Sequence, residues 1–192
     1  MTRFLWSAVL GSLLLLAGCG FPQDRRATPV PEHELPIGLR SDPTATTVPT
    51  STEPATIWFV SGNRLVRVRH DVESPVSVTT VTNELLTGPS AAEQDGGLRS
   101  GLPDPTVVVD AELTRGTARV QLAPSFTEIS PEDQILAVGQ LVLTLTNLPG
   151  IGGVQFSLDG APVAVPLPSG ESSDQPVFRD DFIVLAETDG GV

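Results

Sequence analysis

The sequence predicts an α+β fold: a mixed or antiparallel sheet of about six strands, arranged as three hairpins, with two helices on one face. Apolar residues alternate with polar ones around three two-residue turn signals, which is typical of hairpins. Two other stretches repeat apolar residues at spacings of three and four and begin at Ser-Pro pairs, which is typical of amphipathic helices. All of these elements fall within residues 55–186, so we expect one small domain there.

Residues 1–18 have the features of a signal peptide. A short positive start precedes an apolar run, residues 4–16, that is shorter than the roughly 20 residues needed to span a bilayer. Small residues then precede Cys19, the only cysteine of the chain, and this pattern resembles the lipobox of bacterial lipoproteins. The resemblance implies that Cys19 carries diacylglycerol and becomes the mature N-terminus. The alternative is a cleaved secretory signal with an incidental cysteine.

Residues 19–54, which begin with the lipidated cysteine, are predicted to form a disordered tether. Prolines are crowded here among Thr, Ser, Ala and Glu, with no helical or alternating apolar period. Residues 187–192 are predicted to be a disordered C-terminus. The tether would hold the folded domain away from the membrane surface.

The charge of the chain excludes one class of partner. Asp and Glu number 23 against 11 Lys and Arg, giving a formal net charge of −12. Because binding to phosphates requires a basic face, we expect no nucleic-acid partner.

The first hairpin is predicted around a turn at Gly62-Asn63. This register places four apolar residues on one face, Ile57, Phe59, Val66 and Val68, and sets Trp58 opposite Arg67 on the other. Two roles for Trp58 stay open at this point. The arginine lies over the indole as a cation–π pair, or the indole covers a second apolar layer.

The first helix is predicted to open at Ser74-Pro75 and to end at Gly88-Pro89. Its apolar side consists of Val78, Val81, Thr82 and Leu85. The β-branched residues between Val76 and Thr82 lower the helix propensity, so pattern and propensity disagree here.

The stretch 88–105 is rich in turn formers, and no regular structure is predicted for it. Leu98, Arg99 and Leu102 stand there among glycines and prolines, and we expect them to contact a protein partner. The alternative is that both leucines cap the core while Arg99 pairs with a nearby acid.

The second hairpin is predicted around Arg115-Gly116. One register pairs Leu113 with Ala118, Ala111 with Val120, Val109 with Leu122 and, on the opposite side, Glu112 with Arg119.

The second helix is predicted to begin with Ser130 as the N-cap, Pro131 at the first position and Asp133 completing the cap. Its apolar stripe is Ile135, Val138, Leu141, Val142 and Leu145, with Gln140 on the neighbouring face and Pro149-Gly150 as the stop. A third hairpin follows around Asp159-Gly160, with Val163 predicted opposite Phe156 and Val165 opposite Val154.

The pattern resembles the GerMN domain of sporulation and spore-germination proteins and of cell-envelope lipoproteins of high-GC Gram-positive bacteria. The stretches LLTGP at 85–89 and TLTNLPG at 144–150 carry the resemblance, with further similarity across residues 55–186. It implies a small domain similar to ring-building motifs that acts in protein–protein interaction, and it supplies no catalytic residues.

The residues themselves give no sign of an enzyme. His33 and His70 have no metal-ligand spacing, and no nucleophile or phosphate-binding motif occurs. We therefore expect no cofactor, no metal and no catalysis. The predicted function is a lipoprotein on the extracytoplasmic face of the cell membrane, anchored at Cys19, with a non-catalytic interaction or assembly domain and an envelope protein as partner. The alternative is a lipoprotein that binds a small ligand or an envelope polymer.

Overall fold

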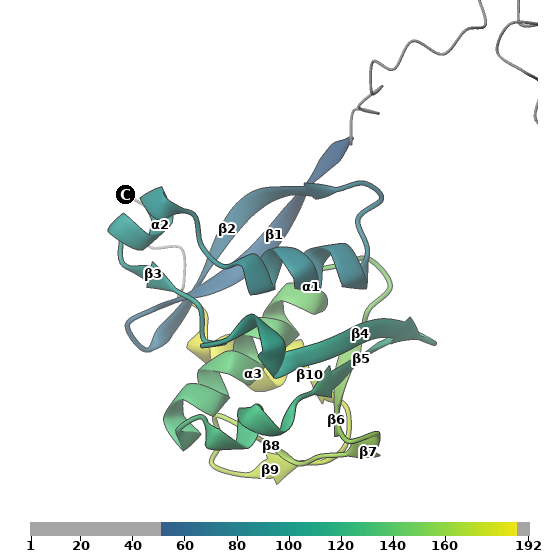
Figure 1. The fold of residues 1–192 in the computed structure, drawn as a ribbon. Helices are drawn as coiled ribbons and strands as arrows, with labels where there is room; N and C mark the ends of the chain where they lie inside the picture. The colour runs from purple at the N-terminus through teal and green to yellow at the C-terminus, as the bar shows by residue number, and fades with distance from the viewer. Residues whose placement is uncertain (1–50, 188–192) are drawn as a thin grey trace, which may run out of the picture. The chain divides into compact units, whose positions relative to one another are not determined.

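The computed structural model describes residues 51–187, drawn in colour in Figure 1. The chain divides into two units, Met1–Thr47 and Val48–Val192, and the first lies wholly outside the described residues. The predictions for the signal peptide, Cys19, most of the tether and residues 188–192 therefore lie outside them as well. Within residues 51–187, no helix is long and apolar enough to cross a membrane.

The first sheet has the strand order β2-β1-β3. β1 (Thr52–Ser61) begins three residues before the predicted domain start and forms an antiparallel hairpin with β2 (Arg64–Glu73). Gly62 occupies the left-handed region at φ 57°, as a two-residue hairpin turn requires. The predicted register is confirmed, with Trp58 opposite Arg67.

Both faces of β1 are covered, because Ile57, Trp58, Phe59 and Val60 are all buried in succession. The Trp58 side chain is only 4 % exposed, so it belongs to a second apolar layer. A cation also lies over the indole: the guanidinium carbon of Arg179 is 5.6 Å from the ring centroid.

Helix α1 (Val78–Thr87) begins three residues after the predicted start. Ser77 is the N-cap, its hydroxyl accepting the backbone N–H of Thr80 while the Thr80 hydroxyl accepts the N–H of Ser77. Because this reciprocal cap satisfies the N–H groups of Ser77 and Thr80, helix α1 begins at Val78 and not at Ser74-Pro75. The predicted apolar side of the helix is confirmed as buried, and Gly88 at φ 85° follows its last residue.

Residues 88–105 contain regular structure, so the prediction of none was wrong. Helix α2 (Ala91–Asp95) forms because the Glu93 carboxylate accepts the N–H of Ser90 at 2.7 Å. Strand β3 (Leu98–Arg99) then pairs with the otherwise open edge of β1. A 3-10 turn, η3 (Pro105–Val107), leads into the second sheet.

The second sheet has the order β10-β6-β5-β4, with β7 paired to β6. Its strands are β4 (Val108–Thr114), β5 (Thr117–Leu122), β6 (Gly153–Leu158), β7 (Ala161–Pro162) and β10 (Val177–Phe178). β5 and β6 are parallel, and η4 (Pro124–Glu128) and α3 (Pro131–Leu145) connect them. The α+β class and the three hairpins are confirmed, but the hairpins lie in two sheets. The connection between parallel strands needs a crossover, which the helix supplies.

Two of the predicted cross-strand pairs differ from those in the structure. Leu122 pairs with Val108, because an irregularity between Val108 and Asp110 turns Val109 outward, where it is 64 % exposed. In the third hairpin the N–H of Val163 bonds the Phe156 carbonyl, as predicted. The prediction for the next pair was wrong, since Val165 in β8 (Val165–Pro166) pairs with β9 (Ser172–Ser173), and β10 takes its place on β6.

Helix α3 lies between β1 and the second sheet (Figure 1). Ser130 caps it by accepting the N–H of Asp133, as predicted, and the helix ends at Leu145, before Pro149-Gly150. Every residue from Leu136 to Leu145 is buried. The expectation that Gln140 lies on a less critical face is therefore corrected, because this helix has no exposed face along those turns. The short helices α4 (Arg179–Phe182) and η5 (Ile183–Leu185) pack against α3.

Candidate functional site: the outer groove of the second sheet

The second sheet leaves one face open. Along β5 the buried residues Ala118, Val120 and Leu122 alternate with more exposed polar ones. β6 repeats this alternation, with Val154 and Phe156 pointing into the core. Because successive side chains of a strand point to opposite faces, all the polar residues gather on the outer face.

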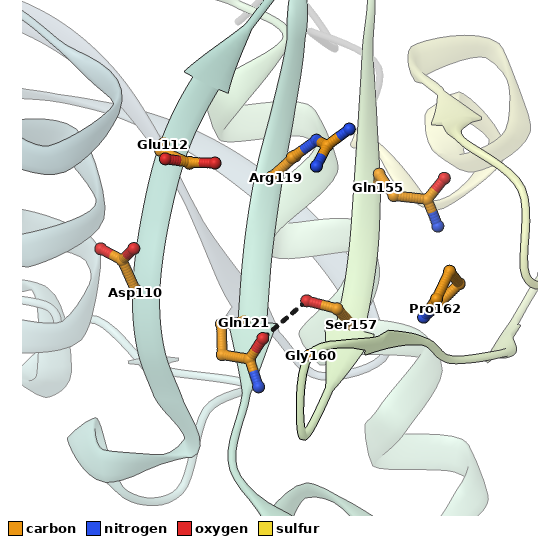
Figure 2. Close-up of a pocket in the computed structure, with 8 residues that line it drawn as sticks. All are labelled: Asp110, Glu112, Arg119, Gln121, Gln155, Ser157, Gly160 and Pro162. Carbon is orange, nitrogen blue, oxygen red and sulfur yellow. Dashed lines mark hydrogen bonds between the residues drawn. The ribbon is translucent and has the colours of Figure 1, made fainter.

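Strand register arranges these polar side chains in two rows (Figure 2). One row runs from Glu112 through Arg119 to Gln155. The next row runs from Asp110 through Gln121 to Ser157. Neighbouring strands lie about 4.8 Å apart, so the side chains of a row lie beside one another.

The outer face is hollowed rather than flat. A cavity of about 350 Å³ is lined by both rows together with Gly160 and Pro162. A second hollow of about 220 Å³ shares Arg119 and Gln155 with the first and is also lined by Thr114, Arg115, Thr117 and Pro176. The two hollows therefore form one depression, which we call the outer groove.

The floor of the outer groove is held by its own hydrogen bonds. The Gln121 amide nitrogen donates to the Ser157 hydroxyl at 2.9 Å in the orientation that satisfies both ends of the amide, and its oxygen then accepts the N–H groups of Asp159 and Gly160. Gln155 donates to the Asp174 carbonyl at 2.8 Å. These side chains fix the β6–β7 turn and the segment before β10.

Asp110, Glu112 and Arg119 carry the charges of the groove, and within residues 51–187 none of the three forms an ion pair. The Glu112 carboxylate accepts a long hydrogen bond, 3.5 Å, from the Thr114 hydroxyl. Figure 2 shows why Arg119 and Glu112 do not pair across the strands: the guanidinium leans toward Gln155 and away from the carboxylate. Three charges in the groove are thus available to a ligand.

An apolar side chain borders the groove at one edge of the sheet. Phe178 on β10 is 53 % exposed and pairs with Gly153 of β6. The Phe178 ring lies against Gly153, where an added Cβ would come within 3.1 Å of the ring. Leu113 on β4 is 52 % exposed, but it pairs with Ala118 and therefore lies on the opposite face of the sheet. A polar centre with an apolar border can bind a partly apolar partner while its charges select the partner.

The residues predicted to contact a partner lie elsewhere, beside the first sheet. Leu98 is half-buried in β3, and Leu102 is 5 % exposed within the core. Arg99 is exposed, with its guanidinium 3.1 Å from the Asp133 carboxylate. This arrangement is the one the sequence offered as the alternative, and a role for these residues in partner binding stays a prediction.

A second cluster of charged side chains joins β2, α1 and α2. The His70 ring nitrogens lie 2.7 Å from the Glu84 carboxylate and 3.0 Å from that of Glu93. Burial lowers the pKa of His70, but the hydrogen bonds and negative charges of both glutamates outweigh it and raise the pKa above its usual 6.5. For Glu93 the two effects have opposite signs: burial raises the pKa of its carboxyl, but hydrogen bonds to Ser90 and His70 outweigh burial and hold the pKa below its usual range.

This cluster is not a metal centre. Across the part of the chain that the structure describes, no group of three or more His, Cys, Asp or Glu is arranged to hold a metal ion. Its geometry is that of a structural clamp: with both ring nitrogens facing carboxylates, only the doubly protonated imidazole can donate to both.

The sequence did not reveal the outer groove. Its residues come from four strands and the turns between them, and both of its rows depend on the parallel pairing of β5 with β6 across α3. The alternation of polar residues along each strand was the available signal. It indicates which side chains share the outer face, but it does not indicate which strand lies next to which.

The fold is that of a small α+β domain seen in solved structures. It is similar to the tandem GerMN domains of the sporulation protein GerM from Bacillus subtilis, with a TM-score of 0.53 and 20% identity. That match covers 72% of this chain and 49% of that one, so the chain spans about half of the tandem structure. The first GerMN domain of the same protein matches with a TM-score of 0.51 and 25% identity, over 67% of this chain and 99% of that one.

The model of the Germane family, described as sporulation and spore germination, matches residues 41–164. The chain belongs to this family. No curated protein matches it.

Proposed function

We propose that the chain is a lipoprotein on the extracytoplasmic face of the cell membrane, anchored through Cys19, whose Germane domain is a non-catalytic module that binds an envelope protein through the outer groove. The observation that carries the proposal is the open face of the second sheet, with charges that form no ion pair among the described residues and the exposed Phe178 at one edge. Membership in the Germane family supports a role connected with sporulation or germination.

The groove has the features expected of a binding surface. Arginine is enriched at interface hot spots, and Arg119 lies in the middle of the groove, lining both hollows. The floor beneath it is hydrogen-bonded, so little side-chain entropy remains to be lost when a partner binds.

The membrane anchor is tested by Cys19→Ser. Because Cys19 is the only thiol of the chain, no other residue can accept the lipid. We expect the variant to leave the membrane fraction or to accumulate as an uncleaved precursor. A variant that fractionates and migrates like the parent protein disproves the lipoprotein assignment.

Binding is tested by crosslinking and recovery of partners from the native membrane. Arg119→Gln is expected to abolish recovery without changing the melting temperature, and Arg69→Gln, an exposed arginine of the first sheet, is the matched control. Equal partner recovery by the parent, Arg119→Gln and Arg69→Gln proteins would remove the outer groove from the interaction.

The second candidate function is binding of a small ligand or an envelope polymer. It is favoured by the volume of the main hollow, about 350 Å³, which falls within the usual range of ligand sites. The test is nuclear magnetic resonance titration with soluble cell-wall fragments. Shifts confined to the amides around Gln121 and Ser157 would support this function, and an unchanged spectrum would dismiss it.

A further inference from the structure

The charges of the outer groove lie at three levels along its length. Asp110 on β4 lies at one end, and Glu112 lies in the next row, directly opposite Arg119. Arg119 lines both hollows, and Arg115, at the β4–β5 turn with φ 52°, lines the hollow at the other end. At about 3.3 Å per residue along a strand, Asp110 and the turn are roughly 13–17 Å apart.

We propose that the outer groove binds an extended segment of a partner protein that carries a cation and a carboxylate four residues apart. The cation lies against Asp110 and the carboxylate lies against Arg115, while Glu112 and Arg119 lie opposite each other in the row between them. This inference rests on the proposed function and specifies the chemistry and orientation of the partner.

An extended peptide matches the groove in spacing and in shape. Residues i and i+4 of an extended chain point to the same side and lie about 13 Å apart, which matches the separation of the acidic and basic ends. Charge-assisted hydrogen bonds at both ends are stronger than neutral ones and fix the direction of the chain. A peptide carrying only one of the two charges would leave the other end of the groove without a partner.

The alternative occupants fit the groove less well. Neither hollow is lined by an aromatic ring among the described residues, and Phe178 stands only at the β10 edge, so a sugar would find no ring to stack on within the groove. A second copy of the chain carries the same net charge of −12, so the two copies repel each other.

The first experiment uses labelled peptides and the full acylated chain in detergent micelles. The probe is a seven-residue peptide, Thr-Lys-Thr-Ser-Thr-Glu-Thr, with Lys and Glu four residues apart, and binding is followed by fluorescence anisotropy at low salt. Three matched peptides replace Lys by Gln, replace Glu by Gln, or move Glu one residue closer to Lys. We expect the probe to bind at least about fivefold more tightly than each of the three.

Variants of the chain then assign each end of the peptide. In Arg115→Gln, at an exposed turn, the preference for Glu over Gln should disappear while the preference for Lys remains. In Asp110→Asn the reverse is expected. Arg69→Gln should keep both preferences.

The outcomes separate this inference from the proposed function. If the parent protein recovers no partner from membranes, the proposed function fails. If Arg119→Gln loses a partner but the peptides bind equally, the groove binds proteins and the charge-spacing inference is wrong. A dimer of the parent chain that Arg119→Gln dissociates would also overturn the inference, because a second copy would then occupy the groove.

Discussion

The two sheets of this domain are covered differently. In the first sheet, four consecutive residues of β1 are buried, because helices pack on both faces. In the second sheet, β5 and β6 bury every other residue and leave a polar face open. The sequence already shows this difference. IWFV at 57–60 is continuously apolar, whereas apolar and polar residues alternate in ARVQL at 118–122.

This contrast separates stability from recognition. Strands covered on both faces contribute mainly buried apolar area, which stabilises the fold. A sheet covered on one face can change its outer residues with little effect on folding, so selection for a partner can act there. Substitutions in and around α3 should therefore unfold the domain, whereas substitutions in the outer groove should change binding alone.

The largest expected effect is that of Leu141→Ala. Leu141 is fully buried on α3, between the two sheets, and truncating such a leucine typically costs about 2–5 kcal/mol of unfolding free energy. Leu113→Ala, at the exposed edge of the second sheet, should cost less than about 0.5 kcal/mol. Chemical denaturation measures both. Similar losses for the two variants would contradict the placement of α3 in the core.

The next effect is that of Gln140→Ala. The Gln140 side-chain oxygen accepts the N–H of Gly101 at 2.5 Å in a buried position. Removing it leaves a buried donor without a partner, which costs about 1–3 kcal/mol. Glu132→Ala, at an exposed position of the same helix, serves as the control in the same denaturation experiment. A loss for Gln140→Ala no larger than that of the control would show that another group satisfies Gly101.

Gln140 also shows what could not be predicted from the sequence. The helix start at Ser130, its register and its apolar stripe were all predicted, because capping and a 3.6-residue period are local signals. The burial of Gln140 depends on Gly101, which lies 39 residues earlier and approaches so closely that an added Cβ would meet Gln140 at 2.9 Å. No local pattern encodes that approach.

The hairpins also separate into features that local sequence predicts and features that depend on distant residues. Turns at Gly62-Asn63 and Arg115-Gly116 fix the registers of their hairpins, and both registers were predicted, except that Leu122 pairs with Val108 and not with Val109. The parallel pairing of β5 with β6 joins strands separated by α3, and the sequence contains no turn that specifies it. The outer groove depends on that pairing, so the candidate site was missed although its residues had been assigned to strands.

The clamp at His70 predicts a pH dependence of stability. Because the pKa of His70 is raised in the folded state, its stabilising contribution is fully present below the unfolded value of 6.5 and is lost as the pH rises through the folded pKa. Glu93, whose pKa is lowered, contributes above its unfolded value of 4.5 and loses that contribution as the pH falls through the folded pKa.

The measurement is the unfolding free energy of the parent protein and of His70→Gln from about pH 5.5 to about pH 8.5, the range in which histidine usually titrates. The difference between the two proteins should shrink as the pH rises. Parallel curves would show that His70 does not carry a proton between the two glutamates.

Arg99→Gln is expected to have the smallest effect on stability. It also tests whether the partner binds at the outer groove or beside Arg99. The ion pair of Arg99 with Asp133 joins side chains that are 49% and 46% exposed, and such exposed pairs are worth only about 0–1 kcal/mol. The melting temperature should therefore hardly change.

Arg99 and Arg119 then form a matched pair of exposed arginines, one in the covered first sheet and one in the open groove. If the outer groove is the contact surface, membrane crosslinking with Arg99→Gln recovers the same partners as the parent protein, while Arg119→Gln recovers none. The opposite pattern would move the binding site to Leu98, Arg99 and the segment that ends at the buried Leu102, and the open sheet face would then have no part in recognition.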